Sequence, residues 1–520
     1  MRWLSRTRNL VWPEPKDPLE RSLLRKADAL ILSYLCLNFC INYLDRVNFI
    51  NAYVSGMGTA LHMKGREYNA VIACFTAGFA IAQIPQNLLL LLIPPRYLFP
   101  LNGVVWGVLT AAGAGATKVQ HLYVIKFFQG MAECSTFIGA HYSLGSWYRP
   151  SEIGRRAALF SASAQIASIF SGSLQSALYT NLDGACGLEG WQWLFIVCGI
   201  ITVPIALFGI YSFPDTPLRT RSSLFTPQER ALAIARLSHP SRAQKTAGGG
   251  VDWTLVRRVL GRWELWGLAL VWTAGGALES YSSWGIMPLW MKAQRTQQGK
   301  PRYTVAELNH HPLGMPAVAI AALLGTRSLR EQAIGTDRRT QDRYAVNLVV
   351  ALAVLVSSLI VLISGLRPVG AVSRGAVYFA FYLSAVSFAG QMSNFAWANE
   401  LLRDDEEARS VVLAGMNVIS YAFNAWFQIA FFPASASPAF TRGSSLIIAF
   451  CPLLALFTMG VRGLQVRTER RRARDREGVV EEEVEEKGGE MGEGKRPGTG
   501  TTVVGEVERE GEEDGKEVER

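Results

Sequence analysis

Twelve apolar runs, each about as long as a helix that crosses a bilayer, constrain this chain more than any other feature of its sequence. They lie near residues 30–51, 68–92, 98–116, 121–145, 156–179, 191–213, 263–291, 304–326, 344–364, 376–399, 410–432 and 444–464. A transmembrane helix needs about 20 predominantly apolar residues. The chain has 520 residues, of which 49% are hydrophobic and only 18% charged, so an ordinary soluble protein is excluded. We predict an all-α membrane protein with twelve transmembrane helices in two six-helix bundles.

The domain organisation follows from where the charged residues lie. We expect a cytoplasmic N-terminal segment, an N-terminal six-helix bundle, a cytoplasmic central loop, a C-terminal six-helix bundle and a disordered charged tail, at 1–27, 28–213, 214–262, 263–465 and 466–520. Within the central loop, Thr226-Pro227-Gln228-Glu229 predicts a capped amphipathic helix on the membrane surface. The tail, rich in Gly, Glu and Lys, has too few apolar residues to bury a core. Two six-helix halves are typical of secondary transporters.

Lysine and arginine counts predict the orientation of the chain. With both termini inside, the inner loops between the runs carry 20 Lys and Arg and the outer loops carry 10. Cytoplasmic loops are enriched in these residues, so we place both termini in the cytoplasm. The net charge of +10 is accounted for by these loops, which leaves no basic patch that predicts nucleic-acid binding. We expect a monomeric multi-pass protein of the plasma membrane, with the vacuolar membrane left open.

Ionisable residues inside the apolar runs are the sharpest functional signal. The first run contains Asn42, Asp45 and Arg46, and the fourth contains Lys126 and Glu133. Such residues are costly in lipid unless they meet a partner or a water-filled cavity. Lys126 and Glu133 lie on one helix face, whereas Asp45 and Arg46 are about 100° apart. We interpret the set as proton-coupling carboxylates beside substrate-binding cations, and internal ion pairs that only fix helix packing remain the alternative.

The second half offers polar but mostly uncharged side chains. The seventh run contains Glu279 and Tyr281, the tenth contains Gln391 and Asn394, and the eleventh contains Asn417. Amide and aromatic groups of this kind suit the wall of a small-molecule cavity, although interhelical hydrogen bonds use the same residues. We predict substrate contacts from Asn42, Arg46, Lys126, Gln391, Asn394 and Asn417. No metal-ligand spacing, phosphate-binding glycine loop or catalytic nucleophile motif occurs in the sequence, so we expect no cofactor, no metal and no enzymatic activity.

Several motifs resemble the major facilitator superfamily, and in particular its anion:cation symporter branch. They are Asn42-Tyr43-Leu44-Asp45-Arg46-Val47-Asn48, Lys126 with Gln129-Gly130 and Glu133, Ser146-Trp147-Tyr148, Gly154-Arg155-Arg156-Ala157 and Phe213-Pro214-Asp215-Thr216-Pro217. The last three look like those of fungal allantoate, pantothenate and vitamin permeases. The resemblance implies uptake of a small organic anion with protons by alternating access. It implies that Asp45 and Glu133 are the protonation sites and that Arg46 engages the substrate or a coupling carboxylate.

The sequence also departs from the pattern of that superfamily. Lys126 stands where Arg is usual, which removes bidentate recognition of a carboxylate. The second–third loop, Leu92-Ile93-Pro94-Pro95-Arg96, and the eighth–ninth loop, Arg327-Ser328-Leu329-Arg330, lack the expected gating motifs. A nutrient sensor that keeps the fold but has lost transport is therefore an alternative.

Overall fold

The predicted apolar runs form helices that pass back and forth along a common direction. The structure is a computed structural model, and it describes residue 15 and residues 17–217, 219–220, 222–236, 253–283, 285–333, 343–367, 372–402 and 405–490. These residues form helices, with one isolated β-bridge between Arg295 and Pro301. The all-α prediction is confirmed.

The N-terminal half consists of helices joined by short turns. They are α2 (Pro18–Ala27), η1 (Asp28–Leu32), α3 (Ser33–Ala52), η2 (Tyr53–Met57), α4 (Gly58–Ala60), α5 (Glu67–Leu92), α6 (Pro95–Ala112), η3 (Gly113–Gly115), α7 (Val119–Glu133), α8 (Ser135–Trp147), α9 (Pro150–Leu182), η4 (Ala185–Gly187) and α10 (Gly190–Ser212). The predicted fourth run is divided at Cys134 into α7 and α8. The six predicted runs of this half all coincide with helical segments.

The C-terminal half follows two helices of the central loop, α11 (Pro227–Arg236) and α13 (Trp253–Leu260). It contains α14 (Trp263–Ser283), α15 (Ile286–Ala293), α16 (Val305–His310), η5 (His311–Leu313), α17 (Gly314–Ala333), α18 (Arg343–Leu366), α19 (Arg374–Ser384), η6 (Ala385–Ser387), α20 (Phe388–Leu401), α21 (Glu406–Phe431), η7 (Ala434–Ala436) and α22 (Thr441–Glu490). Six helices of the described residues are long and apolar enough to cross a membrane by length and composition alone. The other predicted spans are divided by turns or carry the polar residues of the site.

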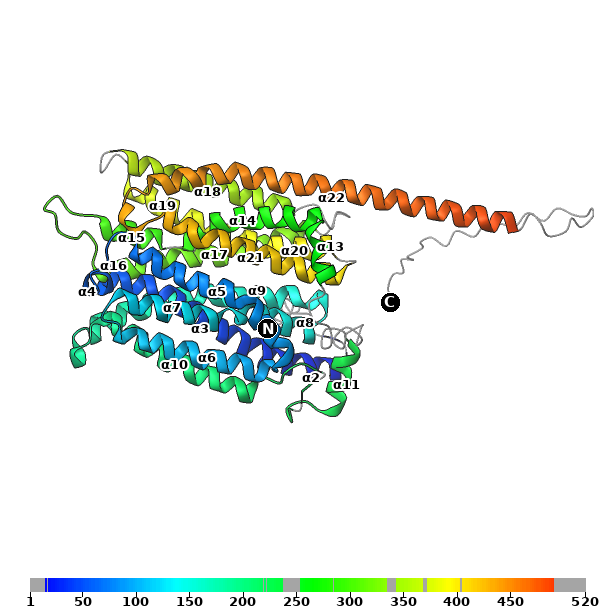
Figure 1. Ribbon diagram of the computed structural model, residues 1–520, viewed down its shortest axis with the longest axis horizontal. Helices are drawn as coiled ribbons and strands as arrows, with labels where there is room; N and C mark the ends of the chain where they lie inside the picture. Colours follow the sequence, from blue (N-terminus) through cyan, green and yellow to red (C-terminus); the bar gives the residue numbers. More distant parts are fainter. Residues whose placement is uncertain are drawn as a thin grey trace, which may run out of the picture. The chain divides into compact units, whose positions relative to one another are not determined.

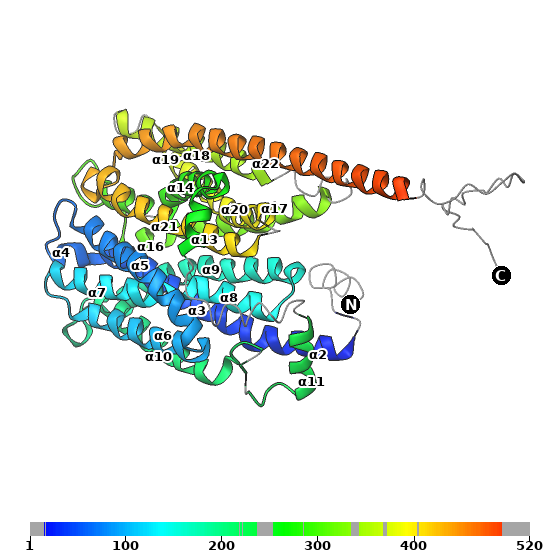
Figure 2. The same cartoon turned by 45° about the vertical axis from the view of Figure 1, so that its right-hand side comes forward.

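Helices of the two halves gather into two groups. Figures 1 and 2 show the N-terminal helices, blue to cyan, on one side and the C-terminal helices, green to orange, on the other. Within the first group α3 packs on α9, α6 on α10 and α5 on α7; within the second α14 packs on α21 and α18 on α19. The groups meet where α5 packs on α21 and where α9 packs on α16 and α17. We call the end that carries α4, α15 and α16 the distal end, and the end that carries α2, α11 and α13 the proximal end (Figure 1).

Two glycines bring α5 and α7 into backbone contact. A Cβ atom on Gly78 would lie 2.1 Å from the carbonyl oxygen of Phe127, and one on Gly130 would lie 2.2 Å from that of Phe75. No side chain fits at either position, so glycine is required for this packing, as is common between transmembrane helices. The close approach holds α7, and with it Lys126, against α5.

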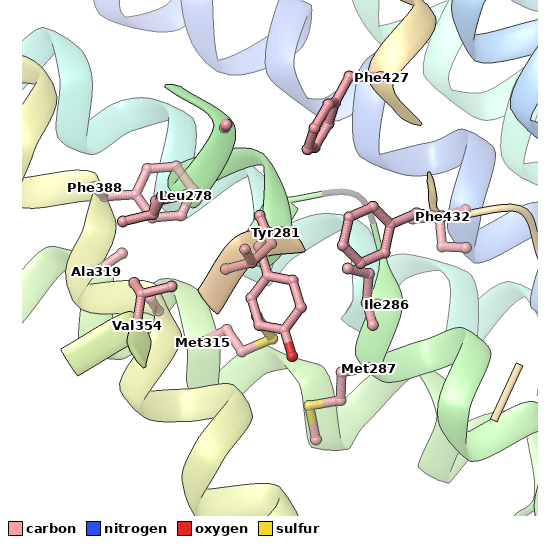
Figure 3. Close-up of a cluster of buried hydrophobic side chains, with 14 of the residues drawn as sticks. Leu278, Tyr281, Ile286, Met287, Met315, Ala319, Val354, Phe388, Phe427 and Phe432 are labelled. Carbon is pink, nitrogen blue, oxygen red and sulfur yellow. The ribbon is translucent and has the colours of Figure 1, made fainter. Parts of the chain in front are cut away.

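Buried apolar side chains fill the C-terminal half beside the site. Tyr281 lies among Met287, Met315 and Phe432 in this core (Figure 3), and its ring centroid is 5.9 Å from that of Phe432. Tyr281 therefore belongs to the hydrophobic core.

Ion pairs attach the first part of the central loop to the N-terminal half. The predicted cap is confirmed, since the backbone N–H of Thr226 donates to Glu229 Oε2 at 2.8 Å and that of Glu229 donates to Thr226 Oγ1 at 3.2 Å. Glu229 also pairs with Lys26 of α2 at 2.8 Å, and Arg236 pairs with Glu20 at 2.9 Å. Helix α11 thus buries Glu229 and Arg236 where it packs on α2.

The second part of the loop belongs to the C-terminal half. Helix α13 packs on α21, and Arg262 Nη1 lies 2.6 Å from Asp405 Oδ2 at the start of α21. The two helices in the described part of the loop are therefore attached to different halves.

The tail differs from the prediction of disorder after residue 465. Helix α22 continues past Gln465 to Glu490. Arg, Glu and Lys are good helix formers, and Gln465 Nε2 donates to Glu469 Oε1 at 2.8 Å across one turn. Residues 491–520, also predicted as disordered, lie outside the described residues.

Candidate functional site

A cavity of about 320 Å³ lies between the two halves. Its volume is within the range of small-molecule binding sites, about 300–1,000 Å³. The polar and charged side chains on its wall come from both halves: Tyr43, Arg46, Tyr68, Thr76, Lys126, Ser161, Gln165, Glu279, Ser280, Ser283, Asn347, Ser387, Gln391, Asn394, Asn417, Ser420, Tyr421, Asn424 and Gln428. Five of the eight predicted site residues are among them, namely Arg46, Lys126, Gln391, Asn394 and Asn417.

The other three predicted residues lie behind the wall. Asn42, Asp45 and Glu133 are fully buried and do not line the cavity. Both polar atoms of the Asn42 side chain lack a hydrogen-bond partner among the described residues. The structure thus does not place Asn42 where it would touch a substrate, whereas the two carboxylates lie beside cavity-lining cations.

Arg46 connects the cavity to Glu133. Its Nε lies 3.1 Å from Glu133 Oε2, and the side chain of Arg46 is 23% exposed while that of Glu133 is 0% exposed. The guanidinium carbon also lies 4.9 Å from the ring centre of Phe79 and 5.3 Å from that of Phe75. Arg46 is therefore paired on one side and reachable from the cavity on the other.

A chain of hydrogen bonds links the two buried carboxylates. Gln129 Nε2 donates to Glu133 Oε1 at 2.8 Å and to Thr110 Oγ1 at 3.2 Å. Thr110 in turn donates to Asp45 Oδ2 at 3.2 Å. Asp45 and Glu133, from α3 and α7, are thereby connected through a hydroxyl of α6.

Lys126 is a second cation on the wall of the N-terminal half. Its Nζ lies 5.5 Å from the ring centre of Phe49 and 6.0 Å from that of Phe195. Among the described residues no acidic group lies within ion-pair distance of it. A buried ammonium group between aromatic rings, open to a cavity, is suited to bind an anion.

Side chains of α14, α20 and α21 form the opposite wall. Gln391 Nε2 donates to Glu279 Oε1 at 2.5 Å, and Asn347 Nδ2 donates to Asn394 Oδ1 at 2.8 Å. Asn417 lies on α21 on the same face as Asn424, seven residues further, and both line the cavity. The predicted polar wall of the second half is therefore present, although Glu279 and Asn347 were not predicted as site residues.

Hydrogen bonds join the two halves at the distal end. Asn69 Nδ2 donates to the carbonyl oxygen of Phe432 at 2.8 Å, and Asn69 Oδ1 accepts from the backbone N–H of Ala434 at 2.8 Å. Lys292 Nζ donates to the carbonyl oxygen of Tyr53 at 2.6 Å.

Aromatic rings border the cavity towards the proximal end. Phe395 lies 6.1 Å from Phe137 and 6.3 Å from His141, measured between ring centres. The two halves are therefore hydrogen-bonded to each other at the distal end and in contact through aromatic rings of α8 and α20 at the proximal end.

Two bundles of membrane-spanning length around a central polar cavity define a membrane transport protein. Residues 35–427 match the family described as the Major Facilitator Superfamily. The chain belongs to this superfamily, which makes it a secondary transporter and not an enzyme.

Two curated relatives are similar over most of their length. The chain is 35% identical to the pantothenate transporter FEN2 of Saccharomyces cerevisiae over 455 residues, which cover 86% of this chain and 85% of that protein. It is 34% identical to the pantothenate transporter liz1 of Schizosaccharomyces pombe over 454 residues, which cover 87% and 84%.

A solved structure has the same fold. A bacterial homologue of the human lysosomal transporter Spinster, in an inward-facing and occupied conformation, gives a TM-score of 0.57 at 15% identity. The match covers 85% of this chain and 97% of that one.

Proposed function

We propose that this chain is a proton-coupled symporter of a small organic anion, with pantothenate as the substrate, and that it works by alternating access. Both curated relatives above are named as pantothenate transporters. The observation that carries proton coupling is the position of Arg46, which lies on the cavity wall and pairs with the buried Glu133 at 3.1 Å.

Competition for Arg46 supplies the coupling. A carboxylate of the substrate and the carboxylate of Glu133 are rival partners for one guanidinium group. When Glu133 takes up a proton it loses its charge, and Arg46 is released to bind the substrate. Proton binding therefore favours anion binding, and the reverse holds by thermodynamic linkage.

Asp45 and Lys126 complete the mechanism. The hydrogen-bond chain through Thr110 and Gln129 connects Asp45 with Glu133, so a change of charge on one carboxylate alters the hydrogen bonding of the other. Lys126 holds the substrate carboxylate from the same wall of the cavity.

The closure at the distal end defines one state of the transport cycle. Asn69 and Lys292 tie the halves together there, while the aromatic contact of Phe395 with Phe137 borders the cavity proximally. Separation of these rings opens the cavity to the proximal side, which the Lys and Arg count assigns to the cytoplasm. We infer an occluded state that opens to the cytoplasm when these rings separate, with both termini cytoplasmic.

The cavity is complete within one chain, so we propose a monomer. The two bundles of the transporter are residues 28–213 and 263–465, and its membrane is the plasma membrane. Localisation of a fluorescent fusion, with protease protection of each terminus, tests the membrane and the orientation.

Uptake by the purified protein in proteoliposomes tests the function. An inward proton gradient is expected to drive accumulation of labelled pantothenate, and its collapse by a protonophore is expected to abolish accumulation. Glu133→Gln is expected to lose gradient-driven accumulation while it still exchanges labelled for unlabelled substrate. Glu307→Gln, which changes a carboxylate in the exposed cap of α16, serves as the matched control.

Two results would overturn the proposal. Absence of pantothenate uptake by the unaltered protein under every gradient would remove the substrate assignment. Normal gradient-driven accumulation by Glu133→Gln would remove Glu133 from the coupling.

A further inference from the structure

The wall of the C-terminal half holds a carboxylate that the coupling pair does not use. Glu279 lines the cavity and is only 8% exposed. Its Oε1 accepts a hydrogen bond from Gln391 at 2.5 Å, whereas its Oε2 is buried without a hydrogen-bond partner in the described part of the chain. A buried oxygen of a carboxyl group without a partner is costly, and a ligand in the cavity would remove that cost.

The helix around Glu279 leaves room for a ligand. Gly275, Gly276, Ser280 and Ser283 share its face of α14 and also line the cavity. A Cβ atom on Gly275 would meet no atom closer than Asn394 Nδ2 at 3.6 Å. Between Gly275 and Ser283, Glu279 is therefore the one large side chain among the described residues of α14 that line the cavity.

Charge is distributed unequally across the cavity. Arg46 and Lys126 lie on the wall of the N-terminal half, and Glu279 lies on the opposite wall. The cations attract the carboxylate of an organic anion, and no cation is among the described residues that line the wall of the C-terminal half. A substrate that also carries hydrogen-bond donors is thus oriented with its carboxylate on the first wall and its donors on the second.

We propose that Glu279, held in place by Gln391, is the group that selects the substrate by accepting hydrogen bonds from hydroxyl or N–H donors remote from the substrate's carboxylate. This inference rests on the proposed function and adds the chemical class of the substrate. The transported anion carries hydrogen-bond donors at the end opposite its carboxylate. Pantothenate fits this description, because its two hydroxyl groups lie at that end. A simple aliphatic monocarboxylate lacks such donors and binds weakly.

A purely structural role is the rival explanation. The hydrogen bond between Gln391 and Glu279 joins α20 to α14, so under this explanation its sole effect is to stabilise the packing of these two helices. Helix α14 is also held by Ser282, whose hydroxyl donates to Ser384 Oγ at the end of α19 at 2.9 Å. A structural role affects all ligands equally, whereas recognition of donors affects only ligands that have them.

The test compares two ligands in the same preparation. Inhibition constants against labelled pantothenate uptake in proteoliposomes are measured for unlabelled pantothenate and for N-(3,3-dimethylbutanoyl)-β-alanine, which keeps the carboxylate, the amide and the methyl groups but lacks both hydroxyls. Because both constants come from one sample, their ratio does not depend on how much protein is folded. The unaltered protein is expected to prefer pantothenate about tenfold or more, since its hydroxyls satisfy a buried carboxyl oxygen that otherwise has no partner among the described residues.

Glu279→Gln is expected to reduce this preference about fivefold or more, because a neutral amide is a weaker acceptor and can itself donate. The constant for the analogue is expected to change less than about threefold, since the analogue never used Glu279. Glu307→Gln is the control and is expected to keep the original ratio.

Each other outcome counts against the inference. An unchanged ratio in Glu279→Gln, or equal weakening of both ligands, assigns Glu279 a structural role. Loss of gradient-driven accumulation with an unchanged ratio assigns it to proton coupling instead. If Glu279→Gln cannot be purified, Gln391→Asn withdraws the supporting amide by one methylene, and an unchanged ratio there also overturns the inference. Absence of pantothenate uptake by the unaltered protein refutes the proposed function itself, so the two failures are distinguishable.

Discussion

Substitution of Arg46 is expected to destabilise the protein more than substitution of its partner Glu133. Arg46→Gln leaves a carboxylate that is 0% exposed with only the hydrogen bond from Gln129 at 2.8 Å. Uncompensated buried charges of this kind cost about 3–5 kcal/mol. Glu133→Gln leaves Arg46, which is 23% exposed and stacks on Phe79, so water in the cavity hydrates it and the cost is about 1–2 kcal/mol.

The double variant Arg46→Gln with Glu133→Gln contains no unpaired charge at this place. It is expected to be more stable than Arg46→Gln alone, with a coupling free energy of about 2–3 kcal/mol between the two positions. Thermal unfolding of the detergent-solubilised proteins, scanned at one fixed rate because such unfolding is often irreversible, gives the order of stability. Arg258→Gln, which removes a 3.5 Å ion pair whose arginine is 55% exposed, is the control and is expected to change stability by less than about 1 kcal/mol.

Additive effects of the two substitutions would refute this reasoning. They would mean that Glu133 is already neutral in the resting protein or that the two side chains do not interact. In either case competition for Arg46 could not couple proton binding to anion binding.

Three further predictions concern packing, pH and the substrate anion. Gly130→Ala is expected to destabilise the protein by about 1–3 kcal/mol, because its Cβ would lie 2.2 Å from a carbonyl oxygen of α5, whereas Gly145→Ala, whose Cβ would meet no atom within 4 Å, is expected to be harmless in the same unfolding assay. Burial raises the pKa of Glu229, but hydrogen bonds from Lys26 and from the start of α11 outweigh it and lower that pKa from 4.5 to about 2. The docking of α11 is therefore expected to be constant from pH 8 to about 5 and to weaken as the pH falls from about 4.5 towards 2, which hydrogen exchange of α11 measures. Lys126→Gln is expected to weaken pantothenate binding about tenfold or more but to leave binding of its neutral amide within about threefold, and equal loss for both would show that Lys126 does not bind the carboxylate.

The sequence predicted the helices well because hydropathy decides them almost alone. A run such as residues 344–364 contains no charged residue and is mostly aliphatic, and the structure forms α18 there over Arg343–Leu366. The division of the fourth run at Cys134 was not predictable from hydropathy, because the residues on both sides of it continue the same apolar pattern.

Helical geometry also predicted part of the site. Asp45 and Arg46 were expected to point about 100° apart, and only Arg46 lines the cavity. Contacts between helices could not be predicted from the sequence. The hydrogen-bond chain from Asp45 to Glu133 passes through Thr110 of α6, and a single threonine in an apolar run does not indicate such a role. Glu279 was visible as a charge in the seventh run, but its role depends on Gln391, more than 100 residues away.

Proton movement that accompanies pantothenate flux tests the coupling most directly. With the protein reconstituted in vesicles that contain a pH-sensitive dye and no initial pH gradient, addition of pantothenate outside is expected to acidify the interior, and Glu133→Gln is expected to abolish the acidification while exchange continues. Pantothenate entry into the same vesicles without any change of internal pH would contradict proton-coupled symport.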